Sequence, residues 1–160
     1  MKRFDQGYKL STERNKALSA FQRFCRLSEV NNYGYGRCWT CGSMVAYNES
    51  DGGHGIPKDH RATELERSNC HIQCLRCNRI LYGRRDVFME HVADEYGQDE
   101  VNRLNDMDAA YNGSEDAMMR LSEEDLLKVK RTRDGEWYHA QYVYWHNLCK
   151  KREKEIENNG

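Results

Sequence analysis

Two CxxC pairs, separated by 32 residues, constrain the fold of this chain more than any other feature. The first pair is Cys38 and Cys41, and the second pair is Cys74 and Cys77. Each CxxC is a tight turn that directs two sulfur atoms at one point, and four thiolates around Zn2+ form a closed tetrahedron. We therefore expect a structural zinc site that joins two distant segments of the chain.

The other cysteines leave two alternatives to this zinc site. The chain contains seven cysteines, and an odd number arranged in CxxC pairs fits metal binding in a reducing compartment better than a disulfide framework. A disulfide, or two unrelated pairs of free thiols, remains the alternative. Cys70 lies just before the second pair and is able to compete as a ligand, but we expect it to pack in the interior.

The composition excludes a large apolar core and a membrane-spanning segment. Of the 160 residues, 38% are hydrophobic and 32% are charged, and the mean hydropathy is -1.02. Metal binding and helix pairing must therefore supply part of the stability. No apolar run is long enough to cross a membrane, and Met1–Gln6 leads into no apolar signal segment. We expect a cytoplasmic protein without a membrane partner.

The formal net charge of -1 conceals two basic ends and an acidic middle. Residues 1–41 contain 8 Lys and Arg against 3 Asp and Glu, and residues 126–160 contain 8 against 5. Residues 98–125 contain 2 against 9. Local basic faces, and not the total charge, decide attraction to phosphate. The chain is therefore able to bind nucleic acid, although its average charge gives no support to that function.

The apolar pattern divides the chain into three predicted segments. Residues 1–35 form a basic arm and an amphipathic helix, residues 36–97 form a core around the cysteine pairs, and residues 98–160 form a helical extension. Helices are predicted over residues 12–28, 86–96, 99–107, 122–133 and 136–155, with a polar linker over residues 108–115.

The longest predicted helix, over residues 136–155, carries a wide aromatic face. Tyr138, Tyr142 and Trp145 belong to this face. Such a face is more typical of a core or a dimer interface than of a surface on which nucleic-acid bases stack.

Short strands are expected between the cysteine pairs and beside them. A strand is predicted over residues 43–47, and residues 54–57 and 69–73 form a predicted hairpin. A helix from residue 74 to residue 83 follows the hairpin and carries the last cysteine.

Histidine and asparagine residues on this hairpin and helix form a constellation suited to phosphodiester hydrolysis. His54 lies on the first strand, and Asn69 and His71 share one face of the second. Asn78 lies on the helix. A neutral imidazole accepts a proton from water, and a divalent ion neutralises charge on a phosphate. Amide oxygens orient a base or ligate a hard cation, so the constellation predicts a metal-dependent phosphodiesterase.

At these residues the sequence resembles the HNH endonucleases, the ββα-metal group, and most closely the phage NinG/Rap recombination nucleases. The resemblance covers about residues 36–107, and its most specific part is the string of residues 69–78. It implies an α+β fold with a small zinc-stapled ββα-metal (treble-clef-like) HNH core and flanking α-helices. The matching residues are Cys38, Cys41, Gly42, Gly53, His54, Asn69–Arg79, Leu81–Gly83, Tyr96, Gly97, Val101 and Leu104.

The resemblance implies a role for each polar residue of the motif. His54 matches the general base, and Asn69 matches the asparagine that orients this histidine. Asn78 matches a ligand of the catalytic ion, which would be Mg2+ or Mn2+. His71 lies on the right strand face for a further ligand or a phosphate contact.

One position departs from the pattern of many HNH nucleases. Many members carry Asp or His immediately before the base as a metal ligand, and this chain has Gly53 there. The NinG/Rap-like pattern also has glycine, so the departure does not exclude activity. Asp51, His60 and His71 remain candidates for the open ligand position, and His71 is preferred.

The resemblance also implies the substrate and the partners. Family members act on branched or single-strand-containing DNA in phage recombination, so the host cytoplasm and a recombination protein as partner are implied. A substrate with two arms suits a homodimer, for which the aromatic C-terminal helix is a candidate interface. Four arginines follow the site closely and are placed to hold the DNA backbone: Arg76, Arg79, Arg84 and Arg85.

Two other functions are compatible with the sequence. The first is a catalytically inactive, zinc-stapled adaptor that binds DNA or protein, for which the glycine at position 53 is the best support. The second is an inhibitor or scaffold that acts through the acidic residues 98–125. Divalent-dependent cleavage separates the nuclease from both, and salt-sensitive DNA binding separates the adaptor from the scaffold.

Overall fold

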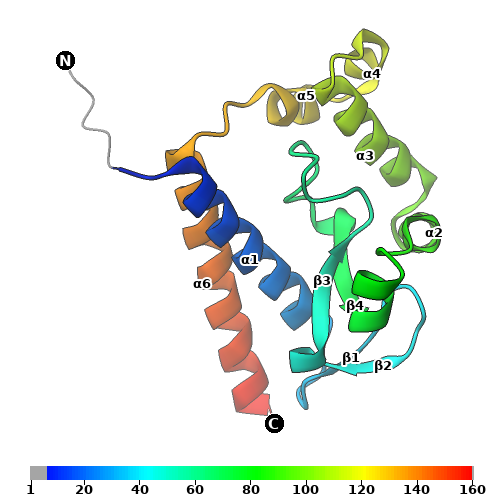
Figure 1. Cartoon of the computed structure of the whole chain (residues 1–160), viewed down its shortest axis with the longest axis vertical. Coiled ribbons are helices and arrows are strands. Elements are labelled where there is room, and N and C mark those ends of the chain that lie inside the picture. Colours follow the sequence, from blue (N-terminus) through cyan, green and yellow to red (C-terminus); the bar gives the residue numbers. More distant parts are fainter. Residues whose placement is uncertain (1–6, 160) are drawn as a thin grey trace.

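A computed structural model describes residues 7–159, which form a mixed α+β structure that is mostly helical and has two small two-stranded sheets (Figure 1). Residues 1–6 of the predicted basic arm lie outside the described residues. The helices are α1 (Leu10–Ser28), α2 (Arg85–Tyr96), α3 (Gln98–Tyr111), α4 (Glu115–Arg120), α5 (Glu123–Lys130) and α6 (Gly135–Asn159). The strands are β1 (Tyr35–Arg37), β2 (Met44–Ala46), β3 (Ser50–His54) and β4 (Cys70–Cys74), and the short helical turns are η1 (Tyr47–Glu49), η2 (Arg67–Asn69) and η3 (Arg76–Ile80).

The two hairpins present the two cysteine pairs. Strands β1 and β2 pair antiparallel, and the first CxxC occupies the turn between them. Strands β3 and β4 also pair antiparallel, and the second CxxC begins where β4 ends and continues into η3. The predicted helix over residues 74–83 is therefore shorter, because η3 spans only Arg76–Ile80 and is a π-helix.

The hairpin formed by β3 and β4, here called the central hairpin, begins earlier than the sequence indicates. The strand predicted over residues 54–57 is β3, and His54 is its last residue and not its first. The sequence suggests a turn at Gly52 and Gly53, but both glycines lie within the strand. A Cβ on Gly52 would lie 2.9 Å from the carbonyl oxygen of Gln22 in α1, so glycine serves here for close helix packing.

The alternation of side chains separates the central hairpin into two faces. His54 pairs with Cys70 and lies on the face that α1 covers, where Phe21 approaches the imidazole with 6.1 Å between ring centroids. Gly53 pairs with His71 on the opposite face. Asn69, predicted to share the strand face of His71, instead ends the 3-10 turn η2 just before β4.

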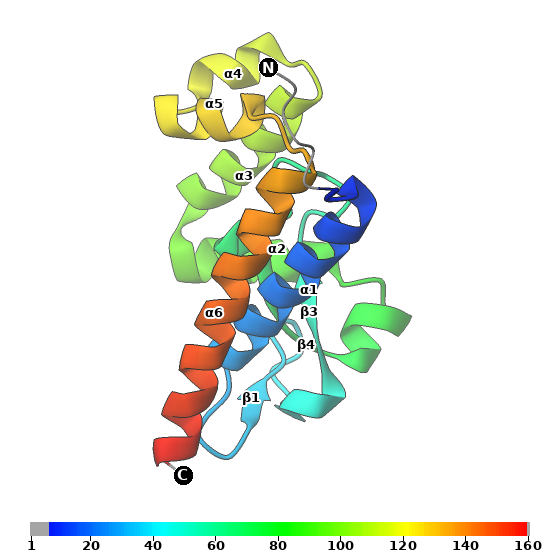
Figure 2. The ribbon, with the colours of Figure 1, turned by 90° about the vertical axis from the view of Figure 1, so that its left-hand side faces the viewer.

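Helices α1 and α6 lie side by side and run in the same direction, although they are at opposite ends of the chain (Figures 1 and 2). Cys149 of α6 donates to the carbonyl oxygen of Ala20, and Arg152 donates to that of Leu27. Trp145 packs edge-on against Phe21, with 4.8 Å between their centroids. Much of the aromatic face of α6 is therefore core, packed within the same chain.

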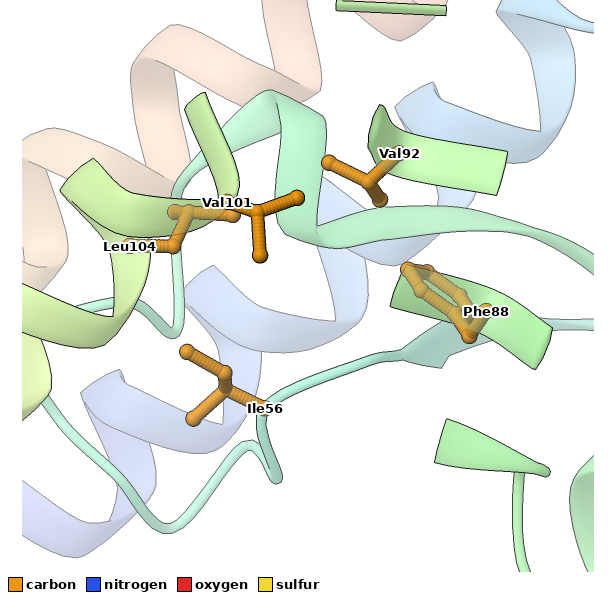
Figure 3. Close-up of a cluster of buried hydrophobic side chains, with 5 residues drawn as sticks. All are labelled: Ile56, Phe88, Val92, Val101 and Leu104. Carbon is orange, nitrogen blue, oxygen red and sulfur yellow. The ribbon is translucent and has the colours of Figure 1, made fainter. Parts of the chain in front are cut away.

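A second apolar cluster joins the loop after β3 to helices α2 and α3 (Figure 3). Ile56 lies on this loop and is fully buried. The cluster fixes the segment that immediately follows His54 against two helices from later in the chain. Its buried members are Ile56, Phe88, Val92, Val101 and Leu104.

The region predicted as a polar linker, residues 108–115, is largely helical. Helix α3 continues to Tyr111, and α4 begins at Glu115 after a cap in which Ser114 accepts a hydrogen bond from the Ala117 backbone. The sequence did not reveal α4 because this short helix buries one residue, Ala117, which packs with Ala110 of α3 and Val129 of α5. Helix α5 begins as predicted, with Ser122 as its N-cap.

Across residues 7–159, every helix is too short or too polar to span a membrane.

Replacement of Phe21 by alanine tests the packing of α1 against the hairpin and α6. Phe21 is 0% exposed, so Phe21→Ala should lower the free energy of unfolding of the zinc-loaded protein by roughly 3–5 kcal/mol. Leu127→Ala is the control, because Leu127 is 69% exposed on α5 and should change it by less than about 0.5 kcal/mol. Urea unfolding measures both, and equal losses would contradict the described core.

Candidate functional site

The four cysteines of the two CxxC pairs converge on one point. The Sγ atoms of Cys38, Cys41, Cys74 and Cys77 all lie within 4.8 Å of one another. The Sγ atoms of Cys41 and Cys74 are 3.9 Å apart. A zinc ion with Zn–S bonds of about 2.3 Å places its sulfur ligands about 3.8 Å apart. The cluster therefore fits the predicted structural zinc.

The pKa values of the thiols in this cluster are shifted in opposite directions, and a bound cation would favour ionisation of all four. Burial raises the pKa of Cys38, but hydrogen bonds from Thr40 and from backbone N–H groups outweigh it and lower this pKa to about 6. Burial and the neighbouring thiols Cys74 and Cys41 raise the pKa of Cys77 to about 12. Four crowded sulfurs cannot all ionise unless a positive ion offsets their repulsion.

Cys70 does not belong to the cluster. It is fully buried on β4 and packs with Phe21 and Cys25. Burial raises its pKa well above the usual value. This placement confirms the expectation that Cys70 packs in the interior.

His54 is held at the end of β3 by a backbone carbonyl. Its Nε2 lies 2.9 Å from the carbonyl oxygen of Glu64. A carbonyl only accepts hydrogen bonds, so Nε2 carries the proton and Nδ1 keeps its lone pair. Burial of the ring lowers the pKa of His54 to about 4. The imidazole is therefore neutral at neutral pH, with Nδ1 as the basic atom.

Two helices hold the residue that supports His54. The carboxylate of Glu64 is buried, and Arg14 of α1 donates to it over 2.9 Å. Tyr138 of α6 donates its hydroxyl to the other carboxylate oxygen. Sequence reasoning missed Glu64 and Tyr138, because they lie 74 residues apart and Glu64 sits in a charged loop with no recognisable motif.

Asn69 braces the loop that follows His54. Its Nδ2 donates to the carbonyl oxygens of Ile56, at 2.9 Å, and Thr63, at 3.1 Å. Its Oδ1 accepts from the Ile56 backbone at 2.7 Å. The side chain therefore fixes the loop, and any effect on the imidazole passes through the backbone.

His71 lies in a different environment from His54. Its ring is buried and stacks on Trp39, with 3.5 Å between centroids. Nδ1 lies 2.5 Å from a carboxylate oxygen of Glu29. Nε2 has no hydrogen-bond partner among residues 7–159. His71 lines a hollow of about 630 Å3 together with Glu29, Trp39, Arg67 and Tyr96.

Asn78 lines a second hollow, of about 300 Å3, between α1, the hairpin and η3. Its Nδ2 donates to Asp51 at 2.9 Å, and Arg79 forms two hydrogen bonds with the same carboxylate. The hydrogen bonds from Arg79 are the main reason that the pKa of Asp51 is lowered. The lining residues are Ser19, Gln22, Arg26, Asp51, Gly52, Lys58, Asn78 and Arg79.

A family model described as Bacteriophage Lambda NinG protein matches residues 5–136. The chain belongs to the NinG family. Neither a curated protein nor a solved structure matches it. The match confirms the predicted phage family, and it ends near the start of α6, so Tyr138, which holds Glu64, lies beyond it.

In this NinG-family chain, three of the four predicted DNA-binding arginines are exposed without an ion pair in the described residues 7–159: Arg76, Arg84 and Arg85. Arg79 is also exposed, but it is paired with Asp51. His60, a candidate ligand, instead lies 2.8 Å from Asp108 of α3. The roles of these residues stay predictions, as does the division of the chain at residues 35 and 97.

Removal of one sulfur tests the zinc site. Cys77→Ser should reduce the zinc content from about one ion per chain to none and abolish cooperative unfolding, because the closed tetrahedron loses a ligand. Atomic emission and urea unfolding measure the two effects. Cys149→Ser is the control, because Cys149 is equally buried but lies outside the cluster. A zinc-free Cys77→Ser protein that still unfolds cooperatively would contradict a structural zinc.

Proposed function

We propose that this chain is a metal-dependent HNH endonuclease that acts on branched or single-strand-containing DNA. The arrangement at two adjacent residues of β3 carries the proposal. His54 keeps Nδ1 available as a base, and the Cβ position of Gly53 lies 3.1 Å from Oδ1 of Asn78. The base and the hard oxygen ligand are therefore placed by adjacent residues of β3, whose side-chain positions lie on opposite faces of the hairpin. Membership of the phage NinG family supports the proposal.

In the proposed hydrolysis, His54, Asn78 and Asn69 have different roles. Nδ1 of His54 takes a proton from water, whose oxygen forms the new P–O bond as the 3′-oxygen leaves. A divalent ion, Mg2+ or Mn2+, supplies positive charge to the phosphate and the leaving oxygen when bound. Asn78 offers Oδ1 to this ion, because its Nδ2 is already engaged by Asp51. Asn69 keeps the loop after His54 in place.

Basic side chains around the site suit a phosphate backbone. Arg26 and Lys58 line the hollow beside Asn78. The exposed Arg76, Arg84 and Arg85 extend the positive surface along η3 and the start of α2. Contacts of basic side chains with phosphates position a DNA strand without reading its base sequence. A recombination protein as partner, and a homodimer through the C-terminal helices, stay predictions.

An exposed tyrosine in the turn after η3 suits a DNA substrate with unpaired nucleobases. Tyr82 is 92% exposed and has a φ of 51°, a left-handed conformation that is uncommon outside glycine. The next residue, Gly83, donates to Cys77 over 2.9 Å, and its Cβ position lies 3.7 Å from the carbonyl oxygen of His54. The turn therefore exposes an aromatic ring one residue before the glycine that approaches the backbone of His54. Unpaired bases stack on such rings, whereas bases in a duplex are already stacked.

His54→Ala tests the proposed base. The variant should cut DNA about 10²- to 10⁴-fold more slowly, because no side chain takes the proton from water. Its zinc content and its affinity for a DNA junction should stay unchanged, since His54 contacts neither the thiolates nor the exposed arginines. Single-turnover cleavage and a binding titration measure these quantities.

His146→Ala is the matched control for this variant, because His146 lies on α6 and stacks on Tyr142. Full activity of His54→Ala would show that another group is the base.

The pH dependence of the wild type tests the buried imidazole. Because the pKa of His54 is about 4, its ring stays unprotonated down to about pH 6. Titration of His54 should therefore cause no fall in the cleavage rate between about pH 7.5 and about pH 6. A loss of rate near pH 6.5 that His54 variants abolish would contradict the buried, neutral imidazole.

Tyr82→Ala tests the preference for unpaired bases. Loss of one stacked base should weaken binding of single-stranded or forked DNA by roughly 5- to 150-fold and leave duplex binding unchanged. Tyr33→Ala is the control, because Tyr33 is 81% exposed in the turn before β1. Equal effects of Tyr82→Ala on duplex and single strand would remove this support for the substrate class.

A further inference from the structure

Two amide oxygens converge on Gly53, which has no side chain. A Cβ built on Gly53 would lie 1.7 Å from Oε1 of Gln73 and 3.1 Å from Oδ1 of Asn78. The oxygen of Gln73 thus occupies the space that a side chain at position 53 would fill. Both oxygens come from neutral amides, which are suitable ligands for a hard divalent cation.

The orientation of the Gln73 amide is fixed by its donors. Nε2 donates to the carbonyl oxygen of Gly83 at 2.9 Å and to Thr40 at 3.2 Å. A carbonyl accepts and never donates, so the nitrogen must lie on this side and Oε1 must face Gly53. Gln73 is 0% exposed, and Oε1 has no hydrogen-bond partner within residues 7–159. A buried polar atom without a partner is costly, and an ion or a buried water would satisfy it.

The orientation of the Asn78 amide is fixed in the same way. Nδ2 donates to the carboxylate of Asp51 at 2.9 Å, and Arg79 donates to both oxygens of this carboxylate. A carboxylate at neutral pH only accepts hydrogen bonds. Oδ1 of Asn78 is therefore the atom that faces Gly53. Asn78 also lines the hollow of about 300 Å3, whereas Gly53 and Gln73 are buried behind it.

We propose that Oε1 of Gln73 is a ligand of the catalytic divalent ion and, with Oδ1 of Asn78, takes the role of the side chain that residue 53 lacks. The proposal rests on the nuclease function proposed above and assigns to Gln73 the ligand position predicted for His71. His71 lines the other hollow, where Trp39 and Glu29 engage its ring.

The proposal accounts for the glycine at position 53. Any Cβ there would displace Oε1 of Gln73, so this placement of the glutamine oxygen requires glycine at position 53. It also connects the two metal sites. Thr40, which accepts from Gln73, lies within the first CxxC and has its hydroxyl 3.4 Å from Sγ of Cys38. The zinc cluster thereby helps to hold the ligand of the second ion.

Mn2+ binding to the zinc-loaded protein tests the proposal without reference to cleavage. Free Mn2+ is counted by electron paramagnetic resonance, in the presence of an uncleavable DNA junction. Gln73→Met and Asn78→Ala should each weaken Mn2+ binding by about tenfold or more, since each removes a ligand oxygen. Gln98→Met is the matched control, because Gln98 lies exposed at the start of α3, and its affinity should equal that of the wild type.

A second measurement uses only the wild type, since Gln73→Met also loses the hydrogen bonds to Gly83 and Thr40. Substoichiometric Mn2+ should broaden the side-chain amide signals of Gln73 and Asn78 before the indole signal of Trp39. Broadening centred on Trp39 would overturn the proposal, because it would place the ion in the hollow of His71. Unbroadened Gln73 signals at saturating Mn2+ would also overturn it and would leave a buried water as the partner of Oε1.

The outcomes separate this proposal from the nuclease function. If Asn78→Ala weakens Mn2+ binding while a folded, zinc-loaded Gln73→Met keeps the wild-type affinity, Gln73 is not a ligand and the nuclease function stands. If the wild type takes up no Mn2+ even with DNA, both proposals fail.

Discussion

The convergence of four cysteine sulfurs is the constraint on which the site depends. It holds the turn between β1 and β2 against the junction of β4 and η3. That junction carries Asn78, and the β1–β2 turn carries Thr40, which helps to orient Gln73. The apolar content is sparse and the clusters of buried residues are small and separate, so the zinc cluster adds to the hydrogen bonds from Gly83 and Asp51 that hold these side chains. Loss of zinc would therefore loosen the segments that carry both amide oxygens.

Helices hold the face of the β3–β4 hairpin on which His54 lies, opposite the face of Gly53 and Gln73. Helices α1 and α6 clamp Glu64 through Arg14 and Tyr138, and the carbonyl of Glu64 fixes the tautomer of His54. The proposed base lies at the end of β3, whereas the proposed ion ligands lie on β4 and η3 and converge on Gly53, the residue before it. The base and the ligands are therefore positioned by different parts of the fold. This arrangement also gives α6, at the far end of the chain, a role in the site.

The sequence predicted features that depend on local spacing. The cysteine cluster, the packing of Cys70, the first helix and the long last helix all follow from short-range patterns. The predicted position of β3 was wrong. In the sequence Gly52 resembles a turn residue, whereas in the fold it lies within the strand and packs against α1. Helix α4 was missed because alanine contributes little to an apolar pattern. The support of His54 by Glu64, and the approach of Gln73 to the glycine opposite His71, arise from tertiary contacts that no spacing encodes.

The central claim is that this NinG-family chain cuts DNA with a divalent ion. The most direct test incubates the zinc-loaded protein with a labelled four-way junction beside a duplex and a single strand of matched sequence. Mg2+ is added to one set and omitted by dialysis from the other, because a chelator would also remove zinc. The account predicts cleavage only with Mg2+, fastest on the junction or the single strand. Binding without cleavage in Mg2+ and in Mn2+ would contradict it and would indicate a zinc-stapled adaptor.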